Sequence, residues 1–293
     1  MVPSTRRRAS VVCEAEGRLL LVRLRDPVSG VEALYPPGGA IEPNEAPAET
    51  ARRETLEETG VKVVVDAATE LVDRYPFCWA GVDYDVTTHY FAATLDEPFT
   101  TALPQVVDAS YNLGALWLAS SEALEALAVH PAIASSVARV LGRARRAVWR
   151  THPNASGPGG TLLAIHDQFR VAAERLVVMV ARDEEPGWIA RAFLPLAQTL
   201  HHHHHAEEAM LFPMVHRRTG VAPERLVTDH EALTAAIDAV GRSLASGSRD
   251  VLRSALASFD AILVAHLDRE EALVMPVLLA LEPAEAWALI HGA

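Results

Sequence analysis

The sequence predicts two domains, an α+β or α/β domain followed by an all-α, up-down four-helix bundle. Short β-rich runs alternate with helical stretches up to residue 150. Residues 151–160 are dense in Pro, Gly, Ser and Asn, and long helical segments follow them. The length of 293 residues suits about two ordinary domains. We therefore expect domains at residues 1–150 and 161–293, joined by a linker at residues 151–160.

The elements of the first domain follow from local hydrophobic patterns. Helices are expected at residues 46–59 and 133–150, where the pattern has a helical period. Strands are expected where β-branched and aromatic residues gather. These runs are 10–13, 19–24, 61–65, 87–94 and 115–118.

The second domain reads as four long helices. Turn-forming residues interrupt it near residues 185–187, 219–223 and 246–248. Short connections between long helices favour antiparallel neighbours and thus an up-down bundle. The expected helices span approximately 161–183, 188–218, 223–245 and 249–281.

Composition excludes several classes of protein. The formal net charge of −12 argues against nonspecific nucleic-acid binding, which needs a basic face. No stretch approaches the roughly 20 uninterrupted apolar residues of a membrane span, so we expect a soluble protein with no membrane partner. Cys13 and Cys78 lack metal-ligand spacing, which favours two buried thiols in a reducing cytoplasm. The oligomeric state stays open.

Residues 38–61, GGAIEPNEAPAETARRETLEETGV, carry the chemistry of the first domain. Pro47 suits the first turn of a helix, and Gly60 suits its end. Between them Glu54, Glu57 and Glu58 are related by i, i+3 and i+4, so three carboxylates share one face. A hard divalent cation such as Mg²⁺ or Mn²⁺ would relieve their repulsion, whereas the alternative is an ordinary acidic surface helix.

This segment resembles the Nudix box. One position departs from the box, because Thr55 stands where the family prefers a larger apolar residue. The positions in register are Gly39, Glu45, Arg53, Glu54, Glu57, Glu58, Gly60 and Val61.

The resemblance implies a fold and an activity for the first domain. The fold is a mixed sheet sandwiched by helices, and the reaction is hydrolysis of a diphosphate linked to another moiety, with a small nucleotide-like substrate. By position, Glu54, Glu57 and Glu58 would bind Mg²⁺ or Mn²⁺, Glu57 or Glu58 would help activate water, and Arg53 would orient the glutamates. The sequence leaves the leaving group and any metal ligand outside the box open. Two roles remain possible for four further side chains, which could contact the substrate by stacking or could pack in the core. They are Tyr35, Trp79, Tyr84 and His89.

An internal repeat marks the second domain. HHHAEEAMLFP begins at His203 and HLDREEALVMP begins at His266, so Glu207 matches Glu270. Upstream, His166 precedes His203 by 37 residues and His230 precedes His266 by 36. Each half therefore offers one helix with a histidine and a second helix with His-x-x-x-Glu.

These side chains predict a two-metal site. Residues four apart lie on one helix face, so each His-x-x-x-Glu pair can converge on one point. Four imidazoles and two carboxylates in a bundle core would be costly without a partner, and this donor set suits iron or manganese. The alternative is a set of separate, half-exposed histidines.

Residues 158–282 resemble the hemerythrin-like HHE domain. The resemblance implies two iron ions with His166, His203, Glu207, His230, His266 and Glu270 as ligands, the glutamates acting as bridges. His204 is a further candidate ligand, whereas His201, His202 and His205 should point elsewhere. Thr234 stands where oxygen-carrying relatives have another histidine, which argues against reversible O₂ transport. Sensing of O₂, nitric oxide or iron, peroxide chemistry and iron storage stay open.

Three functional hypotheses follow. The first is a Mg²⁺-dependent nucleoside diphosphate hydrolase coupled to a di-iron domain that senses oxygen, redox state or iron. The second is a di-iron sensor or binding protein whose first domain binds nucleotide without turnover. In the third, the two domains act independently and are merely tethered.

Overall fold

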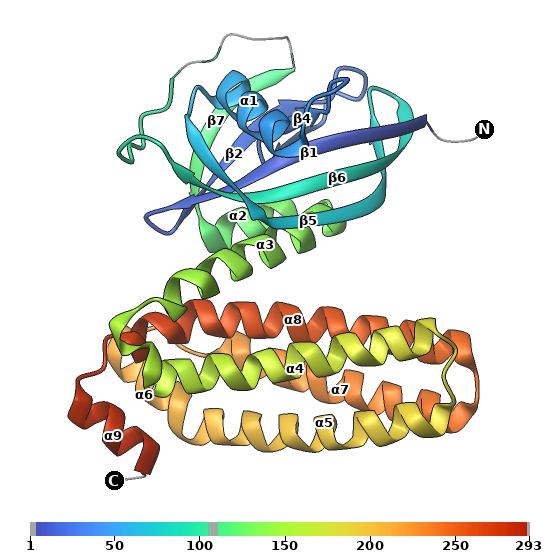
Figure 1. Cartoon of the computed structure of the whole chain (residues 1–293), viewed down its shortest axis with the longest axis vertical. Coiled ribbons are helices and arrows are strands. Elements are labelled where there is room, and N and C mark those ends of the chain that lie inside the picture. The colour runs from blue at the N-terminus through green and yellow to red at the C-terminus, as the bar shows by residue number, and fades with distance from the viewer. Residues whose placement is uncertain (1–3, 105, 107–110, 292–293) are drawn as a thin grey trace. The chain divides into compact units, whose positions relative to one another are not determined.

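The computed structural model describes residues 4–104, 106 and 111–291 and forms two compact units, Met1–Arg145 and Arg146–Ala293 (Figure 1). The boundary falls inside helix α3, Pro131–Arg150. The outer ends of the two predicted domains, residues 1–3 and 292–293, lie outside the described residues.

The first unit is built on a mixed sheet. Its strand order is β3-β2-β1-β6-β5, with β4 pairing with β1 and β7 pairing with β2. β1 and β6 run parallel, and the other pairs are antiparallel. The strands are β1 Ser4–Ala15, β2 Arg18–Arg25, β3 Glu32–Tyr35, β4 Gly38–Ala40, β5 Val63–Trp79, β6 Val82–Leu95 and β7 Asn112–Ala119.

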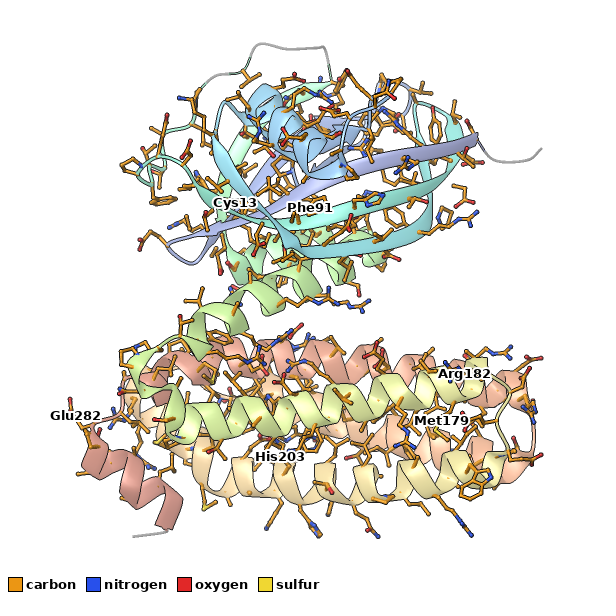
Figure 2. The ribbon with its side chains drawn as sticks, in the orientation of Figure 1. Cys13, Phe91, Met179, Arg182, His203 and Glu282 are labelled. Carbon is orange, nitrogen blue, oxygen red and sulfur yellow. The ribbon has the colours of Figure 1, made fainter. Side chains whose placement is uncertain are left out.

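Both faces of this sheet are covered, so its central strands are apolar on both sides. On β1, Val11 and Cys13 join Phe91 in the core cluster that contains Ala51 of α1 (Figure 2). Val12, between them, joins the cluster on the opposite face, with residues of α2 and α3. These helices are α1 Pro47–Thr59 and α2 Ser120–Leu127, together with α3. The mixed sheet between helices confirms the predicted fold class.

Some elements differ from those expected. β3, β4 and α2 were not predicted, and β5 continues from the expected 61–65 run to residue 79. Cys13 is buried as expected, but Cys78 is exposed, so the prediction of two buried thiols is wrong for Cys78. It lies at the end of β5, where alternate side chains face solvent.

The second unit is a helical bundle. Contacts join α4 to α5, α5 to α7, α7 to α8 and α8 to α4, so the four long helices close into a ring (Figure 1). A core of Leu, Ile, Val and Phe side chains fills it, which confirms the predicted bundle. The helices are α4 Pro158–Ala181, α5 Pro186–Ala206, α6 Phe212–Thr219, α7 Glu224–Ser246, α8 Arg249–Leu279 and α9 Pro283–His291.

Two details depart from the expected helix boundaries. α4 begins at Pro158, inside the stretch expected to be a linker, because proline suits the first helical turn. The expected helix at 188–218 contains a π-helical turn at Glu207–Leu211 between α5 and α6. Within the described residues, no helix is both long and apolar enough to cross a membrane.

Candidate functional sites

Helix α1 presents the acidic residues on its open face. It begins at Pro47, ends at Thr59 and is capped by Gly60, whose φ of 70° lies in the left-handed region that glycine favours. Its opposite face is buried and includes Thr55. The Thr55 hydroxyl donates to the Ala51 carbonyl at 2.7 Å, so this departure from the Nudix box is satisfied inside the helix.

Arg53 organises the carboxylates around it. Its Nε and Nη2 donate to the two oxygens of Glu45, each at 2.9 Å. Its Nη1 donates to Glu54 at 2.8 Å and to Glu57 at 3.0 Å. One planar guanidinium thus fixes three carboxylates.

The two glycines of β4, Gly38 and Gly39, lie beside two of the acidic residues. The Gly38 N–H donates to Glu58 Oε2 at 2.9 Å, and burial raises the pKa of Glu58 to about 7. A Cβ added at Gly39 would lie 2.1 Å from the Glu54 carboxyl carbon, so a larger residue there would displace the Glu54 carboxylate. The Gly38 carbonyl accepts from Arg8 Nη2 at 2.6 Å.

A cavity of about 240 Å³ opens beside these groups. Glu54 and Glu58 lie on its wall with two cationic side chains, Arg6 and Arg8. Six aromatic residues line it, including Tyr75 and Tyr90. The rings of the other four meet edge to face or stacked at centroid distances of 6.0–6.5 Å. They are Tyr35, Phe77, Trp79 and Tyr111.

Of the aromatic residues and histidine weighed for substrate contact, Tyr35 and Trp79 line this cavity. His89 instead pairs with Glu70 at 2.7 Å, and the Tyr84 ring lies 5.5 Å from the Arg6 guanidinium. Phe77 was not identified from the sequence. It lies two residues before Trp79 on β5 and therefore faces the same side of the sheet. The same alternation places Arg6 and Arg8 together on β1.

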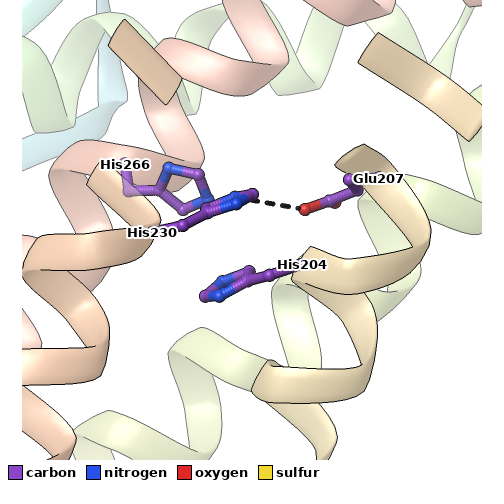
Figure 3. A group of neighbouring side chains, drawn as sticks. All are labelled: His204, Glu207, His230 and His266. Carbon is purple, nitrogen blue, oxygen red and sulfur yellow. Dashed lines mark ion pairs between the residues drawn. The ribbon is translucent and has the colours of Figure 1, made fainter. Parts of the chain in front are cut away.

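The second unit gathers histidines and glutamates in its core. The first group consists of His166 from α4, His203 from α5, Glu207, and Glu270 from α8. The second consists of His204, Glu207, His230 from α7 and His266 from α8 (Figure 3). Within each group the ligand atoms lie within 4.8 Å of one another, so each group could hold one ion.

Glu207 belongs to both groups. Its Oε1 lies 2.7 Å from His203 Nε2, and its Oε2 lies 3.5 Å from His230 Nε2 (Figure 3). Glu270 Oε2 lies 3.5 Å from both His166 Nε2 and His266 Nε2. Glu207 and Glu270 therefore each lie between histidines of two different helices.

Several of these polar atoms make no hydrogen bond of good geometry, although some lie close to another atom of the ligand groups. Among the residues that the structure describes, both carboxylate oxygens of Glu207 and Glu270 are buried without a hydrogen bond. So are the Nε2 atoms of His204 and His230 and both ring nitrogens of His266. Orphaned buried groups of this kind are costly, and metal ions would supply the missing partners. Imidazole and carboxylate together suit iron.

His204, which the sequence indicated only as a further candidate ligand, lies in the second ligand group. Burial lowers its pKa to about 3, so its ring is neutral and retains a lone pair for a metal. Its ring stacks on His230 with centroids 3.9 Å apart. Thr234, by contrast, donates its hydroxyl to the His230 carbonyl at 2.9 Å. The six predicted ligands thus come together with His204, whereas His201, His202 and His205 belong to neither group.

Each of the two units matches a known domain family. Residues 3–140 match the NUDIX domain family, and residues 151–279 match the family described as Hemerythrin HHE cation binding domain. Among curated proteins, none is significantly similar to this chain.

Solved structures resemble a little under half of the chain. A NUDIX hydrolase from Nitrosomonas europaea is 23% identical, with a TM-score of 0.36, over 46% of this chain and 88% of that one. A C. elegans Ap4A hydrolase is 19% identical, with a TM-score of 0.36, over 46% and 93%. The MutT protein from Methanosarcina mazei Go1 is 17% identical, with a TM-score of 0.37, over 48% and 95%.

Proposed function

Because the chain joins a Nudix-type pyrophosphate hydrolase domain to a hemerythrin HHE domain, we propose that it hydrolyses a nucleoside diphosphate linked to another moiety under the influence of a di-iron centre. The observation that carries the first part is the acidic row of α1 beside a cavity with aromatic and cationic walls. The second part rests on the two ligand groups that share Glu207.

In the first domain, Glu54, Glu57 and Glu58 would hold Mg²⁺ or Mn²⁺, for which oxygen ligands are suited. Such an ion, when bound, neutralises phosphate charge and lowers the pKa of the attacking water. Arg53 holds Glu54 and Glu57 in place, and Glu57 or Glu58 would accept the proton of the attacking water.

The cavity favours a nucleotide-like substrate. Arg6 and Arg8 would attract its phosphates, while the faces of Trp79 and Phe77 would stack on a base. Release of nucleoside monophosphate and of the phosphorylated leaving group from a panel of nucleoside diphosphate derivatives with Mg²⁺ tests this. Tight binding of every compound without turnover would instead favour the nucleotide-binding sensor.

Trp79→Ala should raise KM about 10-fold with little change in kcat, because base stacking is worth roughly 1–3 kcal/mol and is the same before and during reaction. Steady-state kinetics on the best substrate of the panel measures this. Trp79→Phe keeps a stacking surface and should stay close to the parent. An unchanged KM in Trp79→Ala would place the base elsewhere.

In the second domain, His166 and His203 would hold one iron and His204, His230 and His266 the other, with Glu207 and Glu270 between them. Such a centre could respond to O₂, another diatomic ligand or the redox state. Metal analysis and an optical spectrum distinguish a diferric centre from zinc. Hydrolysis rates of the metal-free, diferrous and diferric bundle then test the coupling, and identical rates in all three would remove it.

Iron removal should destabilise the second domain. A ligand at 1,000 times its Kd stabilises the folded state by about 4 kcal/mol. For a domain of this size that corresponds to roughly 10 °C in Tm. Calorimetry with and without iron measures the shift, and the transition of the first domain serves as the internal control. Equal unfolding temperatures with and without iron would contradict a structural metal centre.

A further inference from the structure

A buried ion-pair network lies beside the first ligand group. We call it the Glu271 network, and it consists of Arg146, Arg170, Asp268 and Glu271, all in the second unit. Arg146 Nη1 donates to Asp268 at 2.6 Å and to Glu271 at 3.1 Å. Arg170 lies 3.0 Å from Asp268 and 2.9 Å from Glu271. Two cations and two anions balance, so the network can remain charged although buried.

Glu271 also touches a candidate metal ligand. Its Oε1 lies 2.9 Å from His166 Nδ1, and both side chains are at most 1% exposed. The other ring nitrogen of His166, Nε2, lies 3.1 Å from His203 Nε2 and 3.5 Å from Glu270 Oε2. One edge of this imidazole therefore faces the network, and the opposite edge faces the ligand group.

The chemistry of the partners fixes the tautomer of His166. Arg146 and Arg170 can only donate hydrogen bonds, so they keep Glu271 an acceptor. An acceptor at 2.9 Å requires the proton of His166 on Nδ1. In the neutral ring, the form that binds a metal, the lone pair then lies on Nε2, where a metal ion would bind.

We propose that Glu271 is a positioning residue that, held by Arg146 and Arg170, fixes the tautomer and ring orientation of His166 for metal binding. This inference rests on the proposed metal function of the bundle. It adds a residue that belongs to neither ligand group.

The other histidines have weaker counterparts. His230 Nδ1 lies 2.6 Å from Glu208, but Glu208 is 42% exposed and so is screened by water. His266 Nδ1 lies 3.9 Å from Asp229, beyond hydrogen-bond distance. Glu271 should therefore have the largest effect of these three carboxylates.

The chain offers a matched control. Asp268 pairs with the same two arginines as Glu271, whereas none of its recorded contacts among the described residues is with a histidine. Glu271→Gln and Asp268→Asn thus remove the same charge from the same network. Only the first removes the carboxylate that faces His166.

The experiment titrates the iron-free full chain with Fe²⁺, and with Co²⁺ for its visible spectrum. Glu271→Gln should weaken one of the two metal-binding steps about 10- to 100-fold, which is the usual effect of losing a residue that hydrogen-bonds to a metal ligand. Asp268→Asn should bind both metals as the parent protein does. In the parent and both variants, circular dichroism and thermal unfolding of the metal-free protein report folding. Equal weakening in both variants, or none in Glu271→Gln, would overturn the proposal.

A double-mutant cycle provides a second test in case the Glu271→Gln variant folds poorly. If Glu271 acts through His166, adding Glu271→Gln to His166→Ala should cause no further loss of metal affinity. A further loss equal to that of the single variant would overturn the proposal. Failure of the parent protein to bind either metal would refute the metal centre itself, which is a distinct outcome.

Discussion

Glu57→Gln should lower kcat of metal-dependent hydrolysis about 1,000-fold. Metal assistance to the transition state is worth several kcal/mol, and each 1.36 kcal/mol is a factor of ten. The amide cannot replace the carboxylate as a magnesium ligand or accept the proton of the attacking water. Because Glu57 is exposed on α1 and pairs there with Arg53 at 3.0 Å, its replacement should leave the fold intact. Steady-state kinetics with saturating Mg²⁺ measures the effect.

The control for this variant lies on the same helix. Glu49 is also exposed, but it pairs with Arg52 at 3.3 Å instead of with Arg53. Glu49→Gln removes the same charge from α1 and should keep kcat near the parent value. If Glu57→Gln stays as active as Glu49→Gln, the assignment of the glutamate row is wrong.

The ligand groups could be anticipated because they depend on helical periodicity alone. The spacing of His203 and Glu207, and of His266 and Glu270, places each pair on one face of a helix. The internal repeat then indicates that both pairs serve one purpose. The sequence alone could not show how the ligands divide into two groups, because this depends on which carboxylate oxygen faces which helix.

The cavity of the first domain was harder to predict. β5 was expected to end at residue 65, because the polar stretch that follows lacks a clear alternation of apolar residues. Phe77 and Trp79 therefore seemed to lie outside the sheet. In the structure β6 extends β5 by antiparallel pairing as far as Trp79 and Val82. Partner strands, which local sequence does not reveal, thus place two of the cavity's aromatic walls.

The second large effect is expected at Glu207, the residue shared by both ligand groups. Glu207→Ala should remove iron from both positions, with a loss of affinity greater than the roughly 10- to 100-fold typical of residues behind the ligands. His166→Ala, which affects one group, should leave one iron bound. Metal analysis after gel filtration in limiting Fe²⁺ separates the two outcomes. Retention of both irons in Glu207→Ala would contradict the shared carboxylate.

The stability of the same variant gives an independent test. Without metal, neither buried oxygen of Glu207 makes a hydrogen bond of good geometry, although Oε1 lies 2.7 Å from His203 Nε2, and an unsatisfied buried group costs about 1–3 kcal/mol. Glu207→Ala should therefore leave the metal-free protein equally stable or more stable, while iron no longer raises its Tm. His205→Ala, an exposed neighbour in the same histidine run, should keep the iron-dependent rise. If Glu207 is a ligand, its replacement lowers stability relative to the parent only in the presence of iron. A residue that supports only packing would lower stability in both states.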